Sequence, residues 1–228
     1  GYGRWASTLA AGDVARAKVS LSELCSDGDA LYWLESRPAE SGRVVIVRCS
    51  ADGLADHSPD GVSVRSRVHE YGGGAMCLVP GRSAGAVAYV DHVAQRVWFC
   101  DGPASRATPE PLTAPPPDGE VHHHGGLSAT PDGDWVLAVR EVHRQGAGRP
   151  TRSIVALSTR GARPSETTLL DGHDFFGTPR VRPTGDRLAV VVWDHPDMPW
   201  DASAVVVLPL VRRAGATIGA AALEAAAA

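Results

Sequence analysis

Pro183-Thr184-Gly185-Asp186, followed by the apolar run Leu188–Trp193 and then by Ala204–Leu208, decides the fold of this 228-residue chain. A Gly/Asp turn that leads into two strands rich in β-branched residues is typical of an antiparallel β-sheet. The same unit occurs three more times. Its other copies pair a turn with two strands: Ser26–Asp29 with Leu31–Glu35 and Val44–Cys49, Gly81–Gly85 with Ala86–Val90 and Arg96–Phe99, and Pro131–Asp134 with Trp135–Val139 and Ser153–Leu157.

The spacing of the four units indicates the architecture. Equivalent residues of their first strands, Leu31, Val87, Val136 and Leu188, lie 56, 49 and 52 positions apart. Repeats of about 40–50 residues are typical of propeller blades, whereas a β-sandwich, the alternative, has strand signals every 8–12 residues. We therefore predict an all-β chain, a partial β-propeller of about four four-stranded blades. Weaker segments are expected to complete the blades, namely Val62–Arg65, Ala75–Val79, Val121–Leu127 and Thr167–Leu170.

Composition restricts the class of protein. Hydrophobic residues make up 43% and charged residues 21% of the chain, and the formal net charge is -4, which argues against a nucleic-acid partner. No run approaches the roughly 18 apolar residues of a membrane span, so no membrane partner is expected. Gly1–Ala10 lacks the features of a signal peptide, which favours a cytoplasmic chain with Cys25, Cys49, Cys77 and Cys100 reduced.

Three regions are expected along the chain. Residues 1–25 form an N-terminal segment, residues 26–210 form the blades, and residues 211–228 form a C-terminal tail. Ser7 is suited to cap a short helix through Ala17, and Ala220–Ala228 is rich in helix-forming alanine. Four blades of the width usual for a larger ring would leave sheet faces and edges open, so we expect this chain to be part of a longer protein.

Several motifs resemble one family of peptidases. The matching segments are Arg67–Gly74 (RVHEYGGG), Gly172–Arg180 (GHDFFGTPR), Trp193–Asp201 (WDHPDMPWD), Tyr2–Trp5 and Leu31–Pro38. From about residue 2 to residue 210 the chain resembles the N-terminal propeller of the prolyl oligopeptidase family, in its dipeptidyl aminopeptidase/acylaminoacyl peptidase branch.

The resemblance implies a two-domain serine peptidase. Its propeller, of about seven blades, covers an α/β-hydrolase domain that holds a Ser-Asp-His triad. No position of this chain matches the triad motifs, so no catalytic residue and no cofactor are expected, and whether the chain alone is an enzyme stays open. The implied function is to gate and position short peptide substrates for a hydrolase domain absent from this chain. The alternative is a non-enzymatic propeller module that binds a protein or peptide partner.

Glu70 and Arg67 are the candidate substrate-binding residues. We expect Glu70 to face the central channel as a buried carboxylate that binds the free amine of a peptide, with Arg67 as its ion-pair partner. The alternative for His69–Gly74 is a structural motif of an inner strand, in which three consecutive glycines permit a tight bend or the close approach of another backbone.

Two further motifs are predicted to be structural. Gly81–Gly85 fits the pattern Gly-x-Ser-x-Gly and would make Ser83 a nucleophile, but a nucleophile elbow needs a helix after the serine, and here a strand follows. A hairpin turn is therefore expected. His122–His124 suggests a metal site, but neighbouring side chains of a strand alternate between its faces, so no metal is expected there.

Two polar loops complete the candidates. The first loop carries three acids and a histidine around two prolines: Asp194, His195, Asp197 and Asp201. Such a cluster is compatible with a cation site or with a general base. The prolines favour a rigid loop instead, with Trp193 and Trp200 packed beneath it. The segment Arg140–Arg152, which carries Glu141, His143 and several arginines, is expected to be a solvated loop, with a position at a domain interface as a further option.

Overall fold

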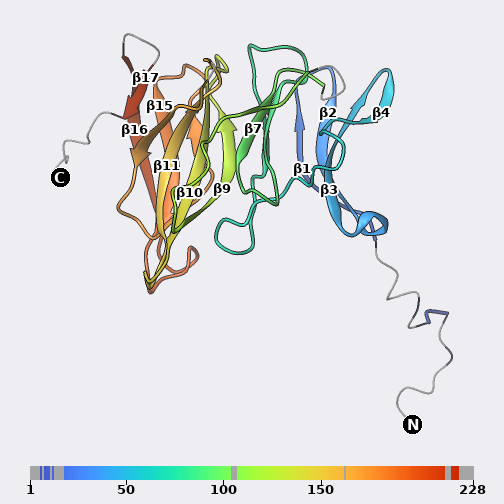
Figure 1. The fold of residues 1–228 in the computed structure, drawn as a ribbon, viewed down its shortest axis with the longest axis horizontal. Coiled ribbons are helices and arrows are strands. Elements are labelled where there is room, and N and C mark those ends of the chain that lie inside the picture. The colour runs from blue at the N-terminus through green and yellow to red at the C-terminus, as the bar shows by residue number, and fades with distance from the viewer. Residues whose placement is uncertain are drawn as a thin grey trace.

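The computed structural model describes residues 6, 8–10, 12, 18–103, 107–161, 163–213 and 217–220. The strands of this part form four antiparallel sheets that follow one another from the N-terminal to the C-terminal side (Figure 1). Each sheet is built from strands consecutive in the chain, so each is one blade. The prediction of an all-β partial propeller is confirmed.

The strands of each blade have the following bounds. Blade 1 contains β1 (Ser20–Ser26), β2 (Leu31–Arg37), β3 (Arg43–Ser50) and β4 (Gly53–Asp56), with a short 3-10 helix, η1 (Pro38–Glu40), between β2 and β3. Blade 2 contains β5 (Met76–Leu78), β6 (Val87–Val90), β7 (Val97–Cys100) and β8 (Glu110–Pro111). Blade 3 contains β9 (Glu120–Ala129), β10 (Trp135–Arg144), β11 (Thr151–Ser158) and β12 (Glu166–Leu170). Blade 4 contains β13 (Phe175–Phe176), β14 (Arg180–Val181), β15 (Arg187–Trp193), β16 (Ala204–Arg213) and β17 (Thr217–Ala220).

The repeated hairpin strands all occur where the spacing places them, but one of the four weaker segments does not complete a blade, and the outer strand of blade 1 lies elsewhere. Val62–Arg65 forms no strand, and Val64 makes an isolated bridge to Asp91. The outer strand is β4, which is exposed throughout and carries little apolar pattern. Blade 4 has five strands, because two short strands, β13 and β14, both pair with β15 on the inner side. The expected Ser7–Ala17 helix and residues 221–228 lie largely or wholly outside the described residues.

The cores lie between neighbouring blades because the strands bury both faces. In β10, Val136 and Ala138 pack against blade 2, while Leu137 and Val139 pack against blade 4. Strands covered on both sides need apolar residues at successive positions, which explains their continuous apolar runs. A third core joins blade 1 to blade 2 through residues that include Tyr32, Leu34, Ile46, Val87 and Tyr89.

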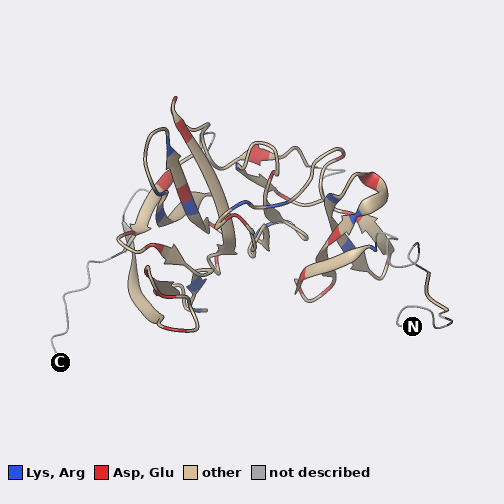
Figure 2. Cartoon of the chain, turned by 90° about the horizontal axis from the view of Figure 1, so that it is seen from below, with Lys and Arg blue, Asp and Glu red and all other residues tan. Residues whose placement is uncertain are grey.

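The innermost strands of the blades touch in succession. β1 contacts β5, β5 contacts β9, and β9 contacts β14. Seen along the perpendicular direction, the sheets follow a curved path, and acidic and basic residues are interspersed along it (Figure 2). The inner strands therefore form one continuous wall on the concave side.

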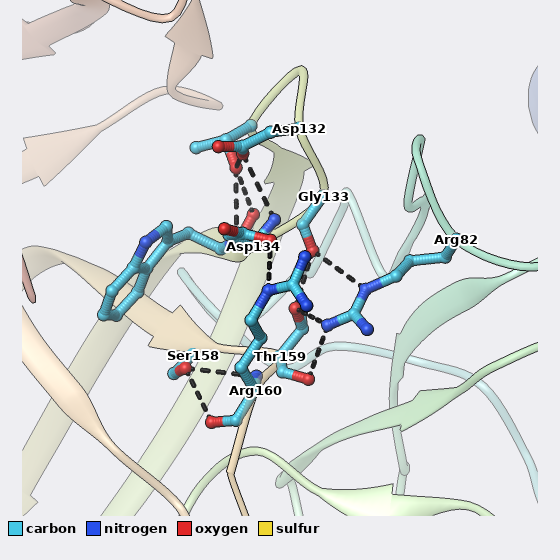
Figure 3. Close-up of polar contacts among 9 residues, drawn as sticks. Arg82, Asp132, Gly133, Asp134, Ser158, Thr159 and Arg160 are labelled. Atoms are coloured by element: carbon cyan, nitrogen blue, oxygen red, sulfur yellow. Dashed lines mark hydrogen bonds and ion pairs between the residues drawn. The ribbon is translucent and has the colours of Figure 1, made fainter. Parts of the chain in front are cut away.

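The Gly81–Gly85 segment is a turn of blade 2 that hydrogen-bonds to blade 3 through Arg82. β6 begins at Val87, so a strand follows Ser83, and the Ser83 amide donates to Asp101 Oδ1 at 2.9 Å. Arg82 donates from Nη2 to the carbonyl and the hydroxyl of Thr159, at 2.7 and 2.6 Å (Figure 3). The turn prediction for this Gly-x-Ser-x-Gly segment agrees with the structure.

Arg82→Ala is expected to lower the free energy of unfolding by about 2 kcal/mol, because it leaves the buried oxygens of Thr159 without a charged donor. Chemical denaturation of the purified variant measures this loss. Arg160→Ala is the matched control. Its guanidinium meets Asp134 within one blade, and the side chain is 55% exposed, so a loss below about 1 kcal/mol is expected. Equal losses for the two variants would show that the contact of Arg82 between the blades stabilises the fold no more than an exposed ion pair within one blade does.

Candidate functional site

Three of the five segments that carry the family resemblance, namely Arg67–Gly74, Gly172–Arg180 and Trp193–Asp201, meet at one place. His69 of the first motif lies edge-on to Phe175 of the second, with ring centroids 5.6 Å apart, and to Trp193 of the third, at 6.0 Å. The rings of Phe175 and Trp193 are stacked at 5.2 Å with an interplanar angle of 5°. His69 lies in the segment before blade 2, whereas Phe175 is in β13 and Trp193 is the last residue of β15, both in blade 4. The cluster therefore joins separate blades.

Glu141 of β10 lies beside this aromatic cluster and is fully buried. Its Oε2 accepts hydrogen bonds from Arg152 Nε at 2.6 Å and from the His69 amide at 3.2 Å, and its Oε1 lies 2.5 Å from His143 Nε2. Burial opposes ionisation, but the neighbouring His123 imidazole and the Arg152 guanidinium outweigh it and lower the pKa of Glu141 to about 2. The site therefore contains a permanently ionised carboxylate.

Arg152 of β11 links this carboxylate to blade 4. Its Nη1 donates to the Asp174 carbonyl at 2.7 Å, and its guanidinium carbon lies 4.6 Å from the centre of the Phe175 ring. A guanidinium that combines an ion pair, a hydrogen bond and an aromatic stack is held in one orientation. The expectation that Arg140–Arg152 is a solvated loop is wrong for Glu141 and Arg152, because both lie in strands at the interface between blades.

The acidic loop after Trp193 is organised around Asp194. Its carboxylate accepts from His173 Nδ1 at 2.8 Å and from the Asp174 amide at 2.6 Å, and the second of these contacts is the main cause that lowers its pKa. Asp174 in turn accepts from the His195 amide at 2.9 Å. These reciprocal contacts are those of a structural loop. The prediction that Trp200 packs beneath it is wrong, because Trp200 is 75% exposed.

Glu70 and Arg67 are not the buried pair that the sequence suggested. Both side chains are exposed, and in the described part of the chain no ion pair joins them. A backbone hydrogen bond from the Glu70 amide to the Arg67 carbonyl, at 2.9 Å, links the two residues. The expectation of a buried Glu70 carboxylate is wrong, and the buried acid is Glu141. The signal that could have found it is a single acid in register with Leu137 and Val139 on one face of an apolar strand.

The glycine run Gly72–Gly74 permits the close backbone approach that its alternative interpretation proposed, but it lies before β5 and not in an inner strand. All three glycines have a positive φ. A Cβ on Gly74 would lie 2.5 Å from Gly126 Cα, and the Gly126 amide donates to the Gly73 carbonyl at 3.0 Å. The run brings the segment before β5 into backbone contact with β9, and Ser66 Oγ adds a hydrogen bond to the His124 carbonyl at 2.6 Å.

The histidine run of β9 points to both faces of the strand, as predicted. His122 Nε2 lies 2.7 Å from Glu120 Oε2, and His124 Nδ1 lies 2.8 Å from the Gln95 carbonyl. Burial lowers the pKa of His124 to about 4, so this imidazole is neutral. His123 points to the other face, toward Glu141.

The concave wall carries a second candidate site. A groove there is lined by residues of β1, β5, β9, β14 and their flanking turns, among them Glu23, Ser128, Thr178 and Arg180. The Glu23 carboxylate accepts from the amides of Ala75 and Met76 at 3.1 and 3.2 Å. Arg180 is exposed and forms no ion pair with the other described residues. The groove therefore offers a guanidinium to a ligand.

Two cysteines line the same groove, and all four cysteines of the chain are free. Burial raises the pKa of Cys25 to about 11 and that of Cys77 to about 12. Both thiols are therefore protonated at neutral pH and are poor nucleophiles.

Comparisons with known proteins support a peptidase relationship. A puromycin-hydrolysing peptidase of Mycobacterium tuberculosis is 33% identical, with a TM-score of 0.75 over 91% of this chain and 32% of that chain. A puromycin hydrolase is 29% identical, with a TM-score of 0.77 over 91% of this chain and 33% of that chain. A putative TolB from Agrobacterium tumefaciens, 16% identical with a TM-score of 0.52, shares the fold alone.

The chain spans about a third of the length of these two peptidases. No protein-family profile matches the chain, and no curated protein matches it. Among the helices of the described residues, none has the length and apolar character needed to cross a bilayer.

Proposed function

Because the chain belongs to the prolyl oligopeptidase family, of which it represents the propeller portion, we propose that it lines the route by which short peptides reach an α/β-hydrolase domain. The observation that carries the proposal is the concave groove formed by the inner strands of all four blades. The hydrolase domain would supply the serine nucleophile and the oxyanion hole, and the blades would supply binding and exclusion of folded proteins. A cytoplasmic location is compatible with the four free cysteines.

Arg180 is the proposed peptide contact in the groove. Its guanidinium is exposed, it lacks an ion-pair partner in the described part, and it can donate two parallel hydrogen bonds to a carboxylate. The Glu23 carboxylate is already bound by two amides, which reduces its repulsion of an anionic group. We therefore expect the groove to favour the carboxyl terminus of a short peptide. The exposed Glu70 carboxylate stays a proposed contact for a free peptide amine, with Arg67 beside it in the same turn.

The outward face of blade 4 supports a place within a larger propeller. Val191, Val205, Val207 and Val211 are between 40% and 66% exposed, while the residues between them face blade 3. Elsewhere in this chain such alternate rows are covered by the next blade. We propose that a further sheet of the same protein covers these valines. The same face favours the alternative function, a module that binds a protein partner.

Fluorescence anisotropy of a short labelled peptide with a free carboxyl terminus tests the proposal. The wild-type chain is expected to bind, and Arg180→Ala is expected to raise the Kd roughly tenfold, the equivalent of about 1.4 kcal/mol. Arg187→Ala, an exposed arginine of the same blade outside the groove, should change the Kd less than about twofold. Peptide binding that both variants lose equally, or no binding by the wild type, would contradict the proposal, and the latter would favour the protein-partner alternative.

A further inference from the structure

The face of blade 3 that meets blade 4 carries a group of possible metal ligands. His123, Glu141 and His143 each offer one ligand atom, and these three atoms lie within 4.8 Å of one another. Glu141 Oε1 lies 2.5 Å from His143 Nε2 and 3.6 Å from His123 Nδ1. We propose that these three side chains bind a zinc ion.

The sheet itself fixes the positions of the three residues. β9 and β10 are antiparallel neighbours, and their register places Glu141 directly opposite His123. Glu141 and His143 are two positions apart on β10, so both side chains leave the same face of the strand. Directly opposed side chains begin only about 5 Å apart at Cβ, so the backbone brings the three donors together without a flexible loop.

The donor set matches zinc better than the hard cations. Two imidazole nitrogens and one carboxylate oxygen are zinc ligands, whereas magnesium and calcium prefer oxygen donors throughout. Zinc bonds of about 2.0–2.1 Å in a tetrahedron place ligand atoms roughly 3.3 Å apart. The two separations from Glu141, 2.5 and 3.6 Å, bracket that value, and all three atoms lie within 4.8 Å, so shifts of about 1–2 Å in the side chains would close the site.

Two observations at the ligands point to an ion. His123 Nδ1 is buried and has no hydrogen-bond partner, and a bound zinc would satisfy it. The second oxygen of Glu141 is held by the Arg152 guanidinium and by the His69 amide, contacts that orient a ligand carboxylate from outside the metal site. The Arg152 charge also repels a cation, so we expect binding weaker than that of a closed structural zinc site.

The site has an entrance. The His143 side chain is 37% exposed, whereas that of Glu141 is 1% exposed and that of His123 is 16% exposed. An ion would enter beside His143, and water would take the fourth position. Three protein ligands with one open position are the arrangement of catalytic zinc sites, and here the open position faces solvent at the edge of the interface between blades.

Isothermal titration of the purified chain with zinc chloride, together with metal analysis after gel filtration, tests the proposal. One zinc per chain is expected for the wild type. His143→Ala removes an exposed ligand and should weaken binding at least tenfold. His173→Ala is the matched control, because His173 is a partly exposed histidine paired with Asp194 elsewhere in the same region, and its Kd should change less than about twofold.

A second readout separates the site from surface histidines. Cobalt(II) in a tetrahedral site with nitrogen ligands gives an intense visible spectrum, which we expect for the wild type and not for His143→Ala. His123→Gln provides a second ligand variant, and circular dichroism checks that both variants are folded. The proposal is overturned if the folded wild type binds no zinc, or if both ligand variants retain its affinity and the cobalt spectrum.

Discussion

Glu141→Gln is expected to lower the free energy of unfolding by about 3–5 kcal/mol, a large part of the roughly 5–15 kcal/mol that stabilises a domain. The carboxylate is fully buried, and its partner Arg152 is 9% exposed. Removing the negative charge leaves a guanidinium in a low-dielectric interface without its counter-ion. Urea denaturation of the wild type and the variant measures the difference.

Glu166→Gln is the matched control, because Glu166 also pairs with an arginine of blade 3, Arg140, but the two side chains are 27% and 24% exposed. A loss of only about 0–1 kcal/mol is expected there. The double variant Glu141→Gln with Arg152→Met removes both buried partners and should recover part of the lost stability. If Glu141→Gln costs no more than Glu166→Gln, the buried ion pair does not stabilise the interface.

Gly74→Ala is expected to cost more than about 3 kcal/mol, because it combines backbone strain with a collision between blades. Gly74 has a φ of +58°, and its added Cβ would lie 2.5 Å from Gly126 Cα and 2.7 Å from Gly126 N. A backbone atom of a neighbouring sheet cannot move aside as the end of a side chain can. Thermal and chemical denaturation of the variant measure the loss.

Gly42→Ala isolates the strain from the collision. Gly42 has a φ of +77°, but its added Cβ would meet nothing within 4 Å. Only the conformational cost of about 1–2 kcal/mol is expected for it. Similar losses for the two variants would mean that the segment before β5 can move away from β9 without penalty.

Most of the fold could be predicted from the sequence because the strands between blades are buried on both faces. Such strands leave unbroken apolar runs, as in Trp135–Val139 of β10, and their spacing reveals the blades. The outer strand β4 could not be predicted in this way. It is exposed throughout, so packing imposes no apolar pattern on Gly53–Asp56. The inner strand of blade 4 is divided into β13 and β14, and both depend on pairing with β15, which no local sequence pattern indicates.

The site could be predicted only in part, because it is assembled from distant segments. The motif around His69 was found, and the close approach of its glycines was anticipated. The sequence points to Glu70 and not to Glu141, because it does not show which acid points inward, and the hydrogen bond from the His69 amide to Glu141 spans 72 positions. The prediction for His123 rests on its immediate neighbours in the chain, whereas its partners in space lie across the sheet on β10.

The central claim is that three of the segments that resemble the peptidase family, around His69, Phe175 and Trp193, meet beside Glu141 and hold blades together. Hydrogen exchange followed by mass spectrometry, on the wild type and on Glu141→Gln, tests it most directly. We predict faster exchange in the variant at residues 68–74, 173–176 and 193–195, which lie in separate segments, with β2 and β3 of blade 1 unchanged. Faster exchange confined to β9, β10 and β11 would contradict the claim.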